Sequence, residues 1–453
     1  MDLTNKAVMV IGLGKSGADL VAFLDHHAKK TMAFDLNDSL SEVYKDRYPK
    51  VEFHFGSNPS GEEEVDLVVI SPGIPIELAF VQRLRERGVR IIGEVELAFQ
   101  MAKGKFIGIT GTNGKTTTTA LTGTLFKNAG YDARIVGNIG RPIIAEVENA
   151  DEHTIFVTEL SSFQLETIEK FRCHAAAIVN ITPDHLNRHK TMENYAHIKG
   201  RIFENQTADD HAIINMDDPL SVEMAERTLA QKLFISVNQD LSHLTPSLYI
   251  RDNQLIFSTK EGKRTIAILD EIFLKGKHNY ENVLIATGIA LSFGIEDELI
   301  AQTLHDFQGV AHRLEFVQEI QGVRFYNDSK GTNPDASIKA LEAIEKNIIL
   351  IAGGMDKKSS FDEFVKAFSN RVKNAILLGE TKHIIAETLD KYGFSNYVIT
   401  EDMEDAVKKA YEIAVEGDTI LLSPACASWD MYSCFEERGE HFKKIVSELE
   451  VLC

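Results

Sequence analysis

The sequence predicts an α/β protein with three domains, each built on a parallel β-sheet between helices. The chain has 453 residues, enough for about three domains of ~150 residues each. Short apolar runs alternate with helical segments along its whole length, which is typical of doubly wound sheets. Glycine-rich turns follow two of these runs, at residues 12–17 and 111–114. We therefore expect domains over residues 1–93, 94–309 and 310–453, the first and third of them Rossmann-like.

Composition indicates a soluble globular protein from a reducing compartment. Hydrophobic residues make up 44% of the chain and charged residues 26%. The four cysteines form no C-x-x-C pair, which argues against a disulfide framework or a structural zinc site. No apolar run approaches ~18 residues and the N-terminus has no charged-then-apolar leader, so we expect a cytoplasmic protein without membrane insertion. The net charge of −20 disfavours nucleic acid as a partner.

The first glycine-rich turn has the G-x-G-x-x-G fingerprint of dinucleotide-binding sheets. It reads Gly-Leu-Gly-Lys-Ser-Gly over residues 12–17, between a predicted strand and a predicted helix. Asp35 ends the next strand, where that fold places an acid. Taken alone, the fingerprint favours NAD, or glycine-dependent packing of helix on sheet without any ligand. A further strand at 65–70 ends in the turn 71–75, another position where open α/β sheets bind ligands.

The second turn predicts a phosphate-binding loop of the P-loop type, and hence a central ATPase domain. An apolar strand precedes Gly111 and Gly114, and a helix begins near Lys115. Backbone N–H groups and a helix dipole converge on an anion there, Lys115 adds positive charge, and Thr116 offers Mg²⁺ a hydroxyl. The strict pattern requires glycine where this chain has Ile109. Two phosphate loops in series indicate two nucleotides instead of one dinucleotide.

Several polar residues of the central domain have both a functional and a local explanation. Glu159 ends a strand, as a Mg²⁺-binding carboxylate would, or it is a helix N-terminal acid stabilised by the dipole. His185 and His189 are four apart, which is weak support for zinc, whereas one imidazole with carboxylates suits a divalent ion that carries phosphate. Lys199 lies in a predicted helix, where lysines are usually solvated. Asn279 is close to a helix N-terminus, where capping is a sufficient explanation.

The remaining segments complete the central and third domains. Residues 248–258 alternate as a small β hairpin around Asp252-Asn253. A boundary follows at 307–313. Strands are expected beyond it at 324–327, 348–351, 375–378 and 419–422, and polar loops at 328–333, 353–357 and 423–430.

With these motifs laid out, the chain resembles, from end to end, the Mur ligase family of ATP-dependent amide-bond ligases in cell-wall precursor synthesis. The phosphate loop, His278-Asn279 and His312-Arg313 resemble motifs shared across that family and indicate the reaction class. Three other motifs resemble those of the branch that adds D-glutamate. They are the opening Gly-Leu-Gly-Lys-Ser-Gly, the Asp-Ser-Lys-x-Thr-Asn loop from residue 328, and Ser-Pro-Ala-x-Ala-Ser from residue 423 with Phe-Glu-x-Arg-Gly from residue 435. Segments 71–74, 159–166 and 180–189 carry the resemblance further.

The resemblance implies a reaction and its participants. The substrates would be UDP-N-acetylmuramoyl-L-alanine and D-glutamate, the cofactors ATP and two Mg²⁺ ions, and the enzyme a monomer in peptidoglycan synthesis, with a part in cell shape and cell division. Lys199 matches a lysine that members of the family carbamylate, which would turn a cation into an anion able to bind metal. The implied catalytic residues are Lys115, Glu159, His185 and Lys199, and the implied metal ligands are Thr116, Glu159, His185 and carbamylated Lys199.

The resemblance also implies the binding residues of each domain. Nucleotide contacts would come from Gly111, Thr112, Asn113, Gly114, Lys115, Thr116, Thr117, Asn279, Arg313 and Asp328. Substrate contacts would come from Gly14, Lys15, Ser16, Gly17, Asp35, Ser71, Pro72, Gly73, Asn138, Ser161, Gln164, Lys330, Thr332, Lys357, Ser428 and Phe435. Leu36 departs from the pattern because it offers no side-chain hydrogen bond beside the uridine. An acyl phosphate must be shielded from water, so we expect the third domain to close about a hinge near 306–312.

Three alternatives remain open at this point. One is a related ligase for a different amino acid, or a folate polyglutamate ligase. Another is an NAD-dependent oxidoreductase built on residues 12–17, which leaves the loop at Lys115 without a purpose. A third is a nucleotide-binding regulator without chemistry.

Overall fold

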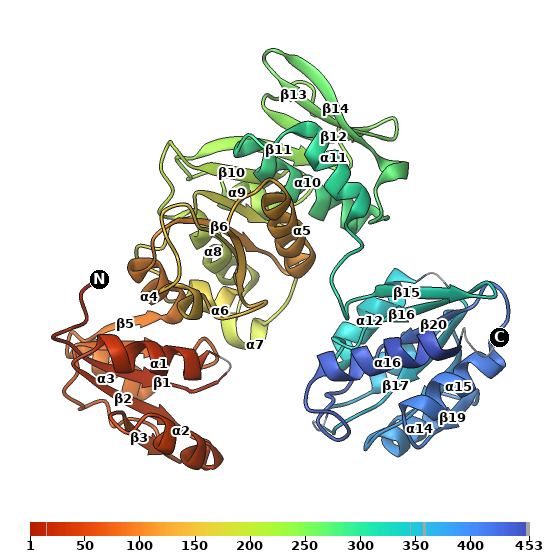
Figure 1. The fold of residues 1–453 in the computed structure, drawn as a ribbon, viewed down its shortest axis with the longest axis horizontal. Helices are drawn as coiled ribbons and strands as arrows, with labels where there is room; N and C mark the ends of the chain where they lie inside the picture. Colours follow the sequence, from red (N-terminus) through yellow and green to blue (C-terminus); the bar gives the residue numbers. More distant parts are fainter. Residues whose placement is uncertain (15, 345, 357–358, 450–453) are drawn as a thin grey trace. The chain divides into compact units, whose positions relative to one another are not determined.

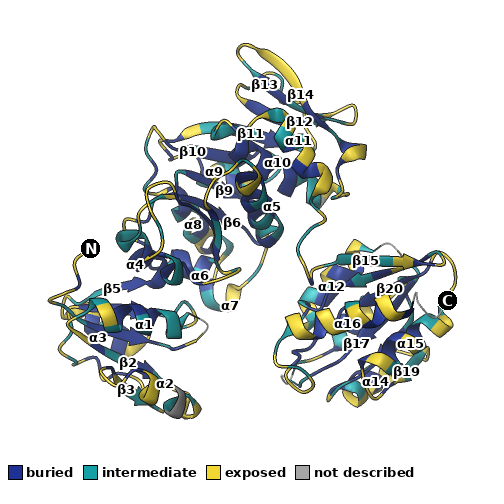
Figure 2. Ribbon diagram, in the orientation of Figure 1, coloured by how far each residue is buried: buried dark blue, intermediate teal, exposed yellow. Residues whose placement is uncertain are grey.

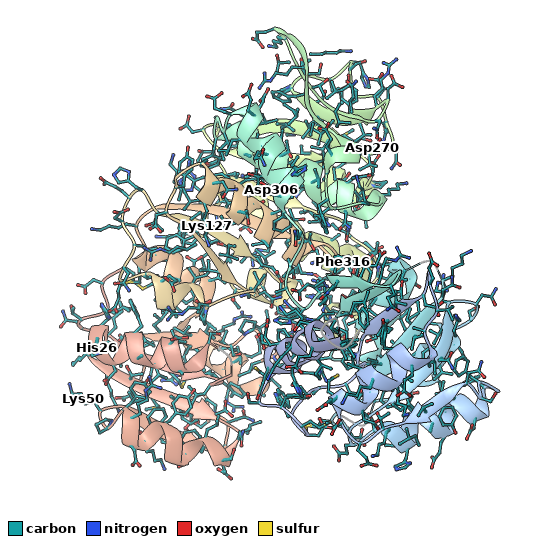
Figure 3. The ribbon with its side chains drawn as sticks, turned by 45° about the vertical axis from the view of Figure 1, so that its right-hand side comes forward. His26, Lys50, Lys127, Asp270, Asp306 and Phe316 are labelled. Atoms are coloured by element: carbon teal, nitrogen blue, oxygen red, sulfur yellow. The ribbon has the colours of Figure 1, made fainter. Side chains whose placement is uncertain are left out.

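The computed structural model describes residues 1–14, 16–344, 346–356 and 359–449 of the chain. They form three mainly parallel sheets flanked by helices, which confirms the predicted α/β class (Figure 1). Contacts divide the chain into two compact units, Met1–Phe307 with two of the sheets and Gln308–Cys453 with the third. Charged side chains such as Lys50, Lys127 and Asp270 project outward from the ribbon (Figure 3).

The first sheet has parallel strands in the order β3-β2-β1-β4-β5. β1 is central and almost wholly buried, as its apolar sequence predicts. The turn 12–17 follows β1 and leads directly into α1, and Asp35 ends β2, both as predicted. The elements are β1 (Ala7–Ile11), α1 (Gly17–His27), β2 (Lys30–Asp35), α2 (Ser41–Arg47), β3 (Glu52–Phe55), β4 (Leu67–Ile70), α3 (Ala79–Glu86) and β5 (Arg90–Gly93).

The second sheet belongs to the same unit and has the order β14-β13-β12-β11-β10-β9-β6-β8-β7. It is parallel from β7 to β12, and β13 and β14 extend it with antiparallel strands. The predicted hairpin is confirmed: Arg251 pairs with Gln254, and Asp252 and Asn253 have φ of 50° and 62°, the left-handed conformations of a two-residue hairpin turn.

The strands of this second sheet are β6 (Lys105–Thr110), β7 (Ala133–Gly137), β8 (Ile155–Glu159), β9 (Ala175–Ile178), β10 (His211–Asn215), β11 (Gln231–Ser236), β12 (Ser247–Arg251), β13 (Gln254–Thr259) and β14 (Gly262–Ile268). Its α-helices are α4 (Glu94–Met101), α5 (Lys115–Asn128), α6 (Ser162–Leu165), α7 (Leu186–His189), α8 (Met192–Gly200), α9 (Pro219–Met224), α10 (Lys277–Ser292) and α11 (Asp297–Asp306). The helix predicted around Lys199 is α8, which ends at Gly200, and a 3-10 turn continues it over Arg201–Phe203.

The third sheet has the order β15-β16-β20-β17-β18-β19, and only β15 in it is antiparallel to its neighbour. The described elements are β15 (Glu315–Ile320), β16 (Val323–Asn327), α12 (Pro334–Ala343), β17 (Ile348–Ala352), α13 (Asp362–Lys366), β18 (Val372–Leu377), α14 (Lys382–Lys391), β19 (Tyr397–Ile399), α15 (Met403–Ile413), β20 (Thr419–Leu422) and α16 (Phe435–Leu449). Apolar clusters on each face of this sheet bury its strands (Figure 2).

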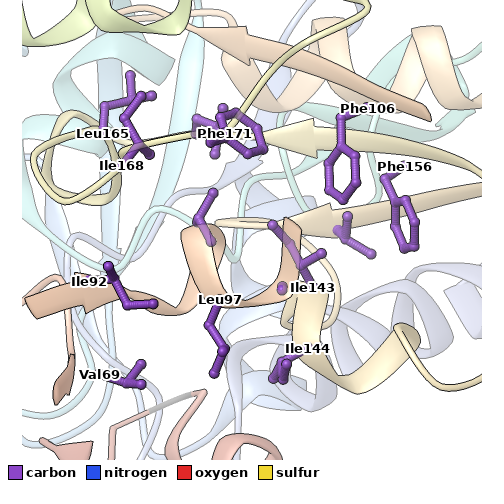
Figure 4. Close-up of a cluster of buried hydrophobic side chains, with 14 of the residues drawn as sticks. Val69, Ile92, Leu97, Phe106, Ile143, Ile144, Phe156, Leu165, Ile168 and Phe171 are labelled. Carbon is purple, nitrogen blue, oxygen red and sulfur yellow. The ribbon is translucent and has the colours of Figure 1, made fainter. Parts of the chain in front are cut away.

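One hydrophobic core joins the first and second sheets within the larger unit. It contains Val69 of β4, Ile92 of β5 and Phe106 of β6, and Leu97 of α4 lies among them (Figure 4). Two carboxylates of α4 reinforce this contact. Glu96 is fully buried and accepts hydrogen bonds from the backbone N–H groups of residues 169–171, and Glu94 accepts one from the N–H of Ile144 at 2.7 Å. Helix α4 therefore fixes the two sheets to each other.

Candidate active site

A cavity of about 320 Å³ lies between the turns of the first sheet and the loops of the second. It opens where the carboxyl ends of parallel strands meet, the position at which open α/β sheets bind ligands. Many of the predicted site residues line it. Its lining comprises Ser16, Ser71, Pro72, Lys115, Gly137, Asn138, Ser161, Ser162, Phe163, Gln164, Asp184, His185, Tyr195 and Lys199.

A larger cavity, of about 460 Å³, lies at the amino ends of the central strands. Lys105 and Ile155, the first residues of β6 and β8, line it together with His174 and His211. Among the described residues that line it, none was predicted as a site residue. The chemistry expected from the sequence therefore belongs to the smaller cavity.

The predicted phosphate loop has the required strand–turn–helix form. Gly114 has a φ of 78° at the N-cap of α5, a conformation that glycine adopts without strain. Neighbouring loops hold it in place, because the N–H of Asn113 donates to Asn180 Oδ1 at 2.9 Å and Thr112 Oγ1 donates to the Thr182 carbonyl at 3.0 Å. Lys115 Nζ turns back to donate to the carbonyls of Gly111 and Thr112, both at 2.9 Å.

These contacts hold the charge of Lys115 over the N-terminus of α5, where an anion would bind. Two of the other predicted nucleotide contacts, Thr116 and Thr117, form the first turn of that helix, and Thr116 is buried.

Lys199 departs from its sequence expectation, because it is buried and not solvated. Its side chain is 2% exposed, and Nζ donates to the Gly111 carbonyl at 2.7 Å and lies 4.7 Å from the ring centre of Tyr195. Burial, followed by the nearby charge of Lys115, holds the pKa of Lys199 well below its ordinary value. The periodicity of α8 did not reveal this, since the helix carries no strong apolar stripe. Such a lysine is a neutral amine over more of the pH range than a solvated one.

Among the described residues, one carboxylate oxygen of Glu159 has a hydrogen-bond partner and the other has none. The residue is 2% exposed; Oε1 accepts from Asn138 Nδ2 at 2.6 Å, while Oε2 is buried and has no hydrogen-bond partner among the residues that the structure describes. Glu159 lies two residues before the N-cap of α6, and the capping box of that helix is formed by Ser161 and Gln164. A buried carboxylate oxygen without a donor suits a cation.

His185 and His189, which are four residues apart in the sequence, lie in different environments. His185 is 48% exposed, lines the cavity and lies 4.9 Å from the Phe163 ring between centres. His189 is buried and bonds to Ser162 Oγ at 2.9 Å, and burial lowers its pKa to about 4. Among the described residues, no group of three His, Cys, Asp or Glu side chains could hold a metal. A metal here would need hydroxyl, phosphate or modified-lysine oxygens besides Glu159 and His185.

The first sheet contributes a second set of predicted contacts. Ser16 is the N-cap of α1, but its side chain makes no capping bond and faces the cavity, which Ser71 and Pro72 also line. Asp35 holds the turn in shape, with Oδ2 accepting from the Leu13 N–H at 2.6 Å and Oδ1 from the Asn37 N–H at 2.8 Å. Gly14, Gly17 and Gly73 lie in the same two turns, and Lys15 lies outside the described residues.

Three predicted residues have local partners. Ser161 and Gln164 hydrogen-bond to each other and form the capping box of α6, and both also line the cavity. Asn279, in the first turn of α10, donates to the Lys275 carbonyl at 2.9 Å, but it is not the cap expected from the sequence, because the N-cap is Gly276. Its Oδ1 accepts weakly from Asn282, whose own Oδ1 accepts from Thr118 of α5 at 3.1 Å. Asn279 is thus connected to the helix of the phosphate loop.

The third sheet gathers the remaining predicted residues in its own unit. Asp328 is buried, accepts from Ser423 Oγ at 2.7 Å, and burial raises its pKa to about 6. Lys330 Nζ lies 5.9 Å from the ring centre of Phe435. Thr332 and Arg313 lie in the same loops, Ser428 is buried after β20, and Lys357 lies outside the described residues. Arg438, the arginine of the motif that begins at Phe435, had no predicted role; its buried guanidinium binds the carbonyls of Ser329, Cys426 and Ala427 and so ties two predicted binding loops together.

Sequence reasoning also missed several residues that line the cavity: Gly137, Ser162, Phe163, Asp184 and Tyr195. Tyr195 is the clearest, because it is 1% exposed and its hydroxyl lies 3.2 Å from Thr112 Oγ1 in the phosphate loop. Its only signal in the sequence is its position one helical turn before Lys199, on the same face of α8.

Comparisons with known proteins agree along the whole chain. Three family models match: "Mur ligase MurD-like, N-terminal domain" over residues 6–93, "Mur ligase middle domain" over 109–290 and "Mur ligase, glutamate ligase domain" over 312–426. A UDP-N-acetylmuramoylalanine--D-glutamate ligase from Thermoanaerobacter sp. (strain X514) is 48% identical over 99% of this chain and 100% of its own. A protein of the same name from Clostridioides difficile (strain 630) is 44% identical, with the same coverage.

A solved structure shares the fold at much lower sequence identity. UDP-N-acetylmuramate-alanine ligase from Thermotoga maritima superposes with a TM-score of 0.57 and 16% identity, covering 98% of this chain and 100% of that one. Within the described part of the chain, no helix has both the length and the apolar character needed to cross a bilayer.

Proposed function

The chain belongs to the Mur ligase family, and we propose that it joins D-glutamate to UDP-N-acetylmuramoyl-L-alanine at the expense of ATP. Full-length relatives at 44–48% identity carry the name of that ligase. One observation in the structure supports the proposal most directly. The phosphate loop at Lys115 lines the same cavity as the turns at Ser16 and Ser71, which would hold the diphosphate and the uridine of the acceptor, so two phosphate-bearing substrates can meet there.

The first step activates a carboxylate, which is a poor electrophile because oxide is a poor leaving group. A carboxylate oxygen of the acceptor's L-alanine attacks the γ-phosphorus of ATP, the bond to the β-phosphate oxygen breaks, and ADP leaves. The product is an acyl phosphate. Lys115 stabilises the negative charge that spreads over the transferred phosphoryl group.

In the second step the amine of D-glutamate attacks the acyl carbon, the tetrahedral intermediate expels inorganic phosphate, and the amine loses a proton. Asn138, Ser161 and Gln164 face the cavity, where they can hold the acceptor in position. Lys330, Thr332, Lys357, Ser428 and Phe435 would hold the amino acid, whose two carboxylates call for cations and hydroxyls. Arg313 and Asp328, with Asn279, would bind the nucleotide.

The donor set around Glu159 fits magnesium. Its bare buried oxygen, the exposed imidazole of His185 and the hydroxyl of Thr116 are available for two ions, together with phosphate oxygens. When bound, Mg²⁺ neutralises the charge of the triphosphate and the substrate carboxylate. A carbamate on Lys199 would add anionic oxygens, and its formation needs the neutral amine that burial of Lys199 favours.

The domain division of 1–93, 94–309 and 310–453 and a closing motion about 306–312 form part of this proposal. The boundary between the two compact units, Phe307 to Gln308, falls inside that segment. We further propose a monomer that acts in the cytoplasm, in peptidoglycan precursor synthesis.

Phosphate release tests the function. The protein is incubated with ATP, Mg²⁺, UDP-N-acetylmuramoyl-L-alanine and one amino acid from a panel that includes D-glutamate, L-glutamate and a diamino acid. We expect release that depends on the acceptor and is largest with D-glutamate. Release with L-glutamate or the diamino acid alone would overturn the substrate assignment, and ATP turnover without dependence on any amino acid would overturn the ligase itself.

A further inference from the structure

Arg188, which no predicted role includes, links the first sheet's domain to the floor of the cavity. It lies in α7, after the β9 strand. Its guanidinium makes a charge-assisted hydrogen bond to Glu166 and donates to the Ile74 carbonyl at 3.2 Å. Its charged centre also lies 4.9 Å from the ring centre of Phe163. One side chain therefore contacts the 71–74 turn of the first domain and two residues that follow β8.

The pairing of Arg188 with Glu166 is removed from water. The side chains are 13% and 6% exposed, so solvent screens their attraction little. Burial raises the pKa of Glu166, and the hydrogen bond from Arg188 opposes that rise. Both hydrogen bonds come from one guanidinium nitrogen, Nη2, whose two N–H groups allow it to serve the carboxylate and the Ile74 carbonyl together.

Both walls that Arg188 touches belong to the cavity. Phe163 lines the cavity and contacts both Arg188 and the His185 ring, and Ser71 and Pro72 line it from the turn that ends at Ile74. The other end of this turn is anchored to its own sheet, since the Ser71 N–H donates to the Ile11 carbonyl at 2.8 Å. Arg188 thus holds the second end of the turn, from the opposite domain.

We propose that Arg188 is a positioning residue that fixes the 71–74 turn against the phosphate-transfer site. The inference rests on the proposed function, in which this turn holds the UDP part of the acceptor. A fixed turn sets the distance between the held diphosphate and the point at which the acceptor's carboxylate must meet the γ-phosphate. Loosening it should weaken productive binding of the acceptor and leave ATP binding intact, because Arg188 contacts no residue of the phosphate loop among the hydrogen bonds and ion pairs of the described chain.

Arg201 provides a matched control. It is also a half-buried arginine that packs on the segment after β8, donating to the carbonyls of Leu165, Glu166 and Ile168. Its hydrogen bonds all remain within the second sheet's domain, so Arg201→Ala should lower stability without a selective effect on the acceptor. Arg188→Lys is a second variant that keeps the charge beside Glu166 but not the guanidinium that reaches Ile74 at the same time.

The experiment compares wild type, Arg188→Ala, Arg188→Lys and Arg201→Ala as full chains. We expect Arg188→Ala to raise the KM for the acceptor about tenfold or more, the loss expected for a hydrogen bond to a charged group, while the KM for ATP changes less than about twofold. Arg188→Lys should fold like the wild type and show the same selectivity to a smaller extent. Equal increases in both KM values, or an acceptor KM within about twofold of wild type in both Arg188 variants, would overturn the proposal.

Hydrogen exchange separates this inference from the function on which it rests. Without any substrate, amides of residues 71–76 should exchange faster in both Arg188 variants than in wild type and Arg201→Ala. Unchanged exchange would refute the positioning role even if the ligase activity is confirmed. Faster exchange in a protein without ligase activity would leave the structural link standing and overturn its assignment to the acceptor.

Discussion

Lys115 and Lys199 donate to the same acceptor, the carbonyl oxygen of Gly111, at 2.9 Å and 2.7 Å. The two amines come from the first turn of α5 and from the last turn of α8. Their proximity is unfavourable when both are charged, and burial adds to the cost for Lys199, so the pKa of Lys199 falls. One carbonyl of the phosphate loop therefore accepts from two amines in different surroundings, because Lys199 is buried and Lys115 is only partly buried.

Carbon dioxide should therefore be needed for full activity. A carbamate forms from a neutral amine, and a lowered pKa makes Lys199 neutral at a lower pH than a solvated lysine. Equilibration in CO₂-free buffer should reduce turnover several-fold, and bicarbonate should restore it. With ¹³C-bicarbonate, NMR should show a carbamate carbon that is missing from Lys199→Met. Full activity in CO₂-free buffer, together with no carbamate signal, would contradict this prediction.

Replacement of Lys199 by methionine should stabilise the fold while it removes activity. Methionine matches the length of the lysine stem and avoids burying an amine. The Gly111 carbonyl keeps its bond from Lys115, so no acceptor is orphaned. We expect a gain of about 1 kcal/mol, or roughly 1–2 °C in the unfolding midpoint of a unit this large. A lower midpoint at pH 7 would show that the amine stabilises the loop.

Lys115→Ala should abolish formation of the acyl phosphate and spare binding of the UDP substrate. Loss of a cation aimed at developing charge typically costs about 10²–10³ in turnover or more. Hydroxylamine trapping would follow the acyl phosphate, and calorimetry would follow acceptor binding, which we expect to remain within about twofold of wild type. Lys103→Ala, an exposed lysine before β6, is the control. Trapped hydroxamate at wild-type levels would refute the assigned role of Lys115.

Glu94 should make the larger unit less stable as pH rises. Burial raises its pKa from 4.5 to about 7. The folded state therefore holds the proton of Glu94 more tightly than the unfolded state does. The contribution of Glu94 to stability is thus fully present below pH 4.5 and is lost as the pH rises through about 7. The shift corresponds to roughly 3 kcal/mol. Glu94→Gln keeps an acceptor for the Ile144 N–H but cannot ionise, so its unfolding midpoint should vary less between pH 5 and 8. Identical pH profiles would rule out Glu94 as the cause.

Local patterns were sufficient to predict much of the fold. Buried apolar runs located β1, β6, β8 and β20 to within a residue or two, and the glycine-rich turns after β1 and β6 located two of the cavity's walls. The strands that were not anticipated, such as β3 and β15, are only partly buried and lack a clear alternation. β19 has three residues, too few to show a period.

The site was less accessible to sequence reasoning, because its decisive contacts join distant positions. Arg188 meets Ile74 across a separation of 114 residues, and Lys199 meets Gly111 across 88. Neither contact produces a pattern in the neighbouring sequence from which it could be predicted. The resemblance supplied a role for Lys199, yet only the structure shows why its amine is unusual. For Glu159 the local sequence permits two readings, a metal ligand or an acid beside a helix N-terminus, and its hydrogen bond to Asn138 and its buried second oxygen are visible only in the structure.

Helix α4 has a consequence for how the molecule unfolds. The family models divide the chain into three segments, yet the buried carboxylates of Glu94 and Glu96 bind backbone amides of the neighbouring domain inside one continuous apolar cluster. Unfolding of the first sheet alone would expose to water the backbone amides that Glu94 and Glu96 bind. It would also expose the apolar side chains that pack against that sheet in the shared cluster. The first two segments should therefore lose structure in a single cooperative step, and calorimetry should resolve two transitions where the sequence counts three domains.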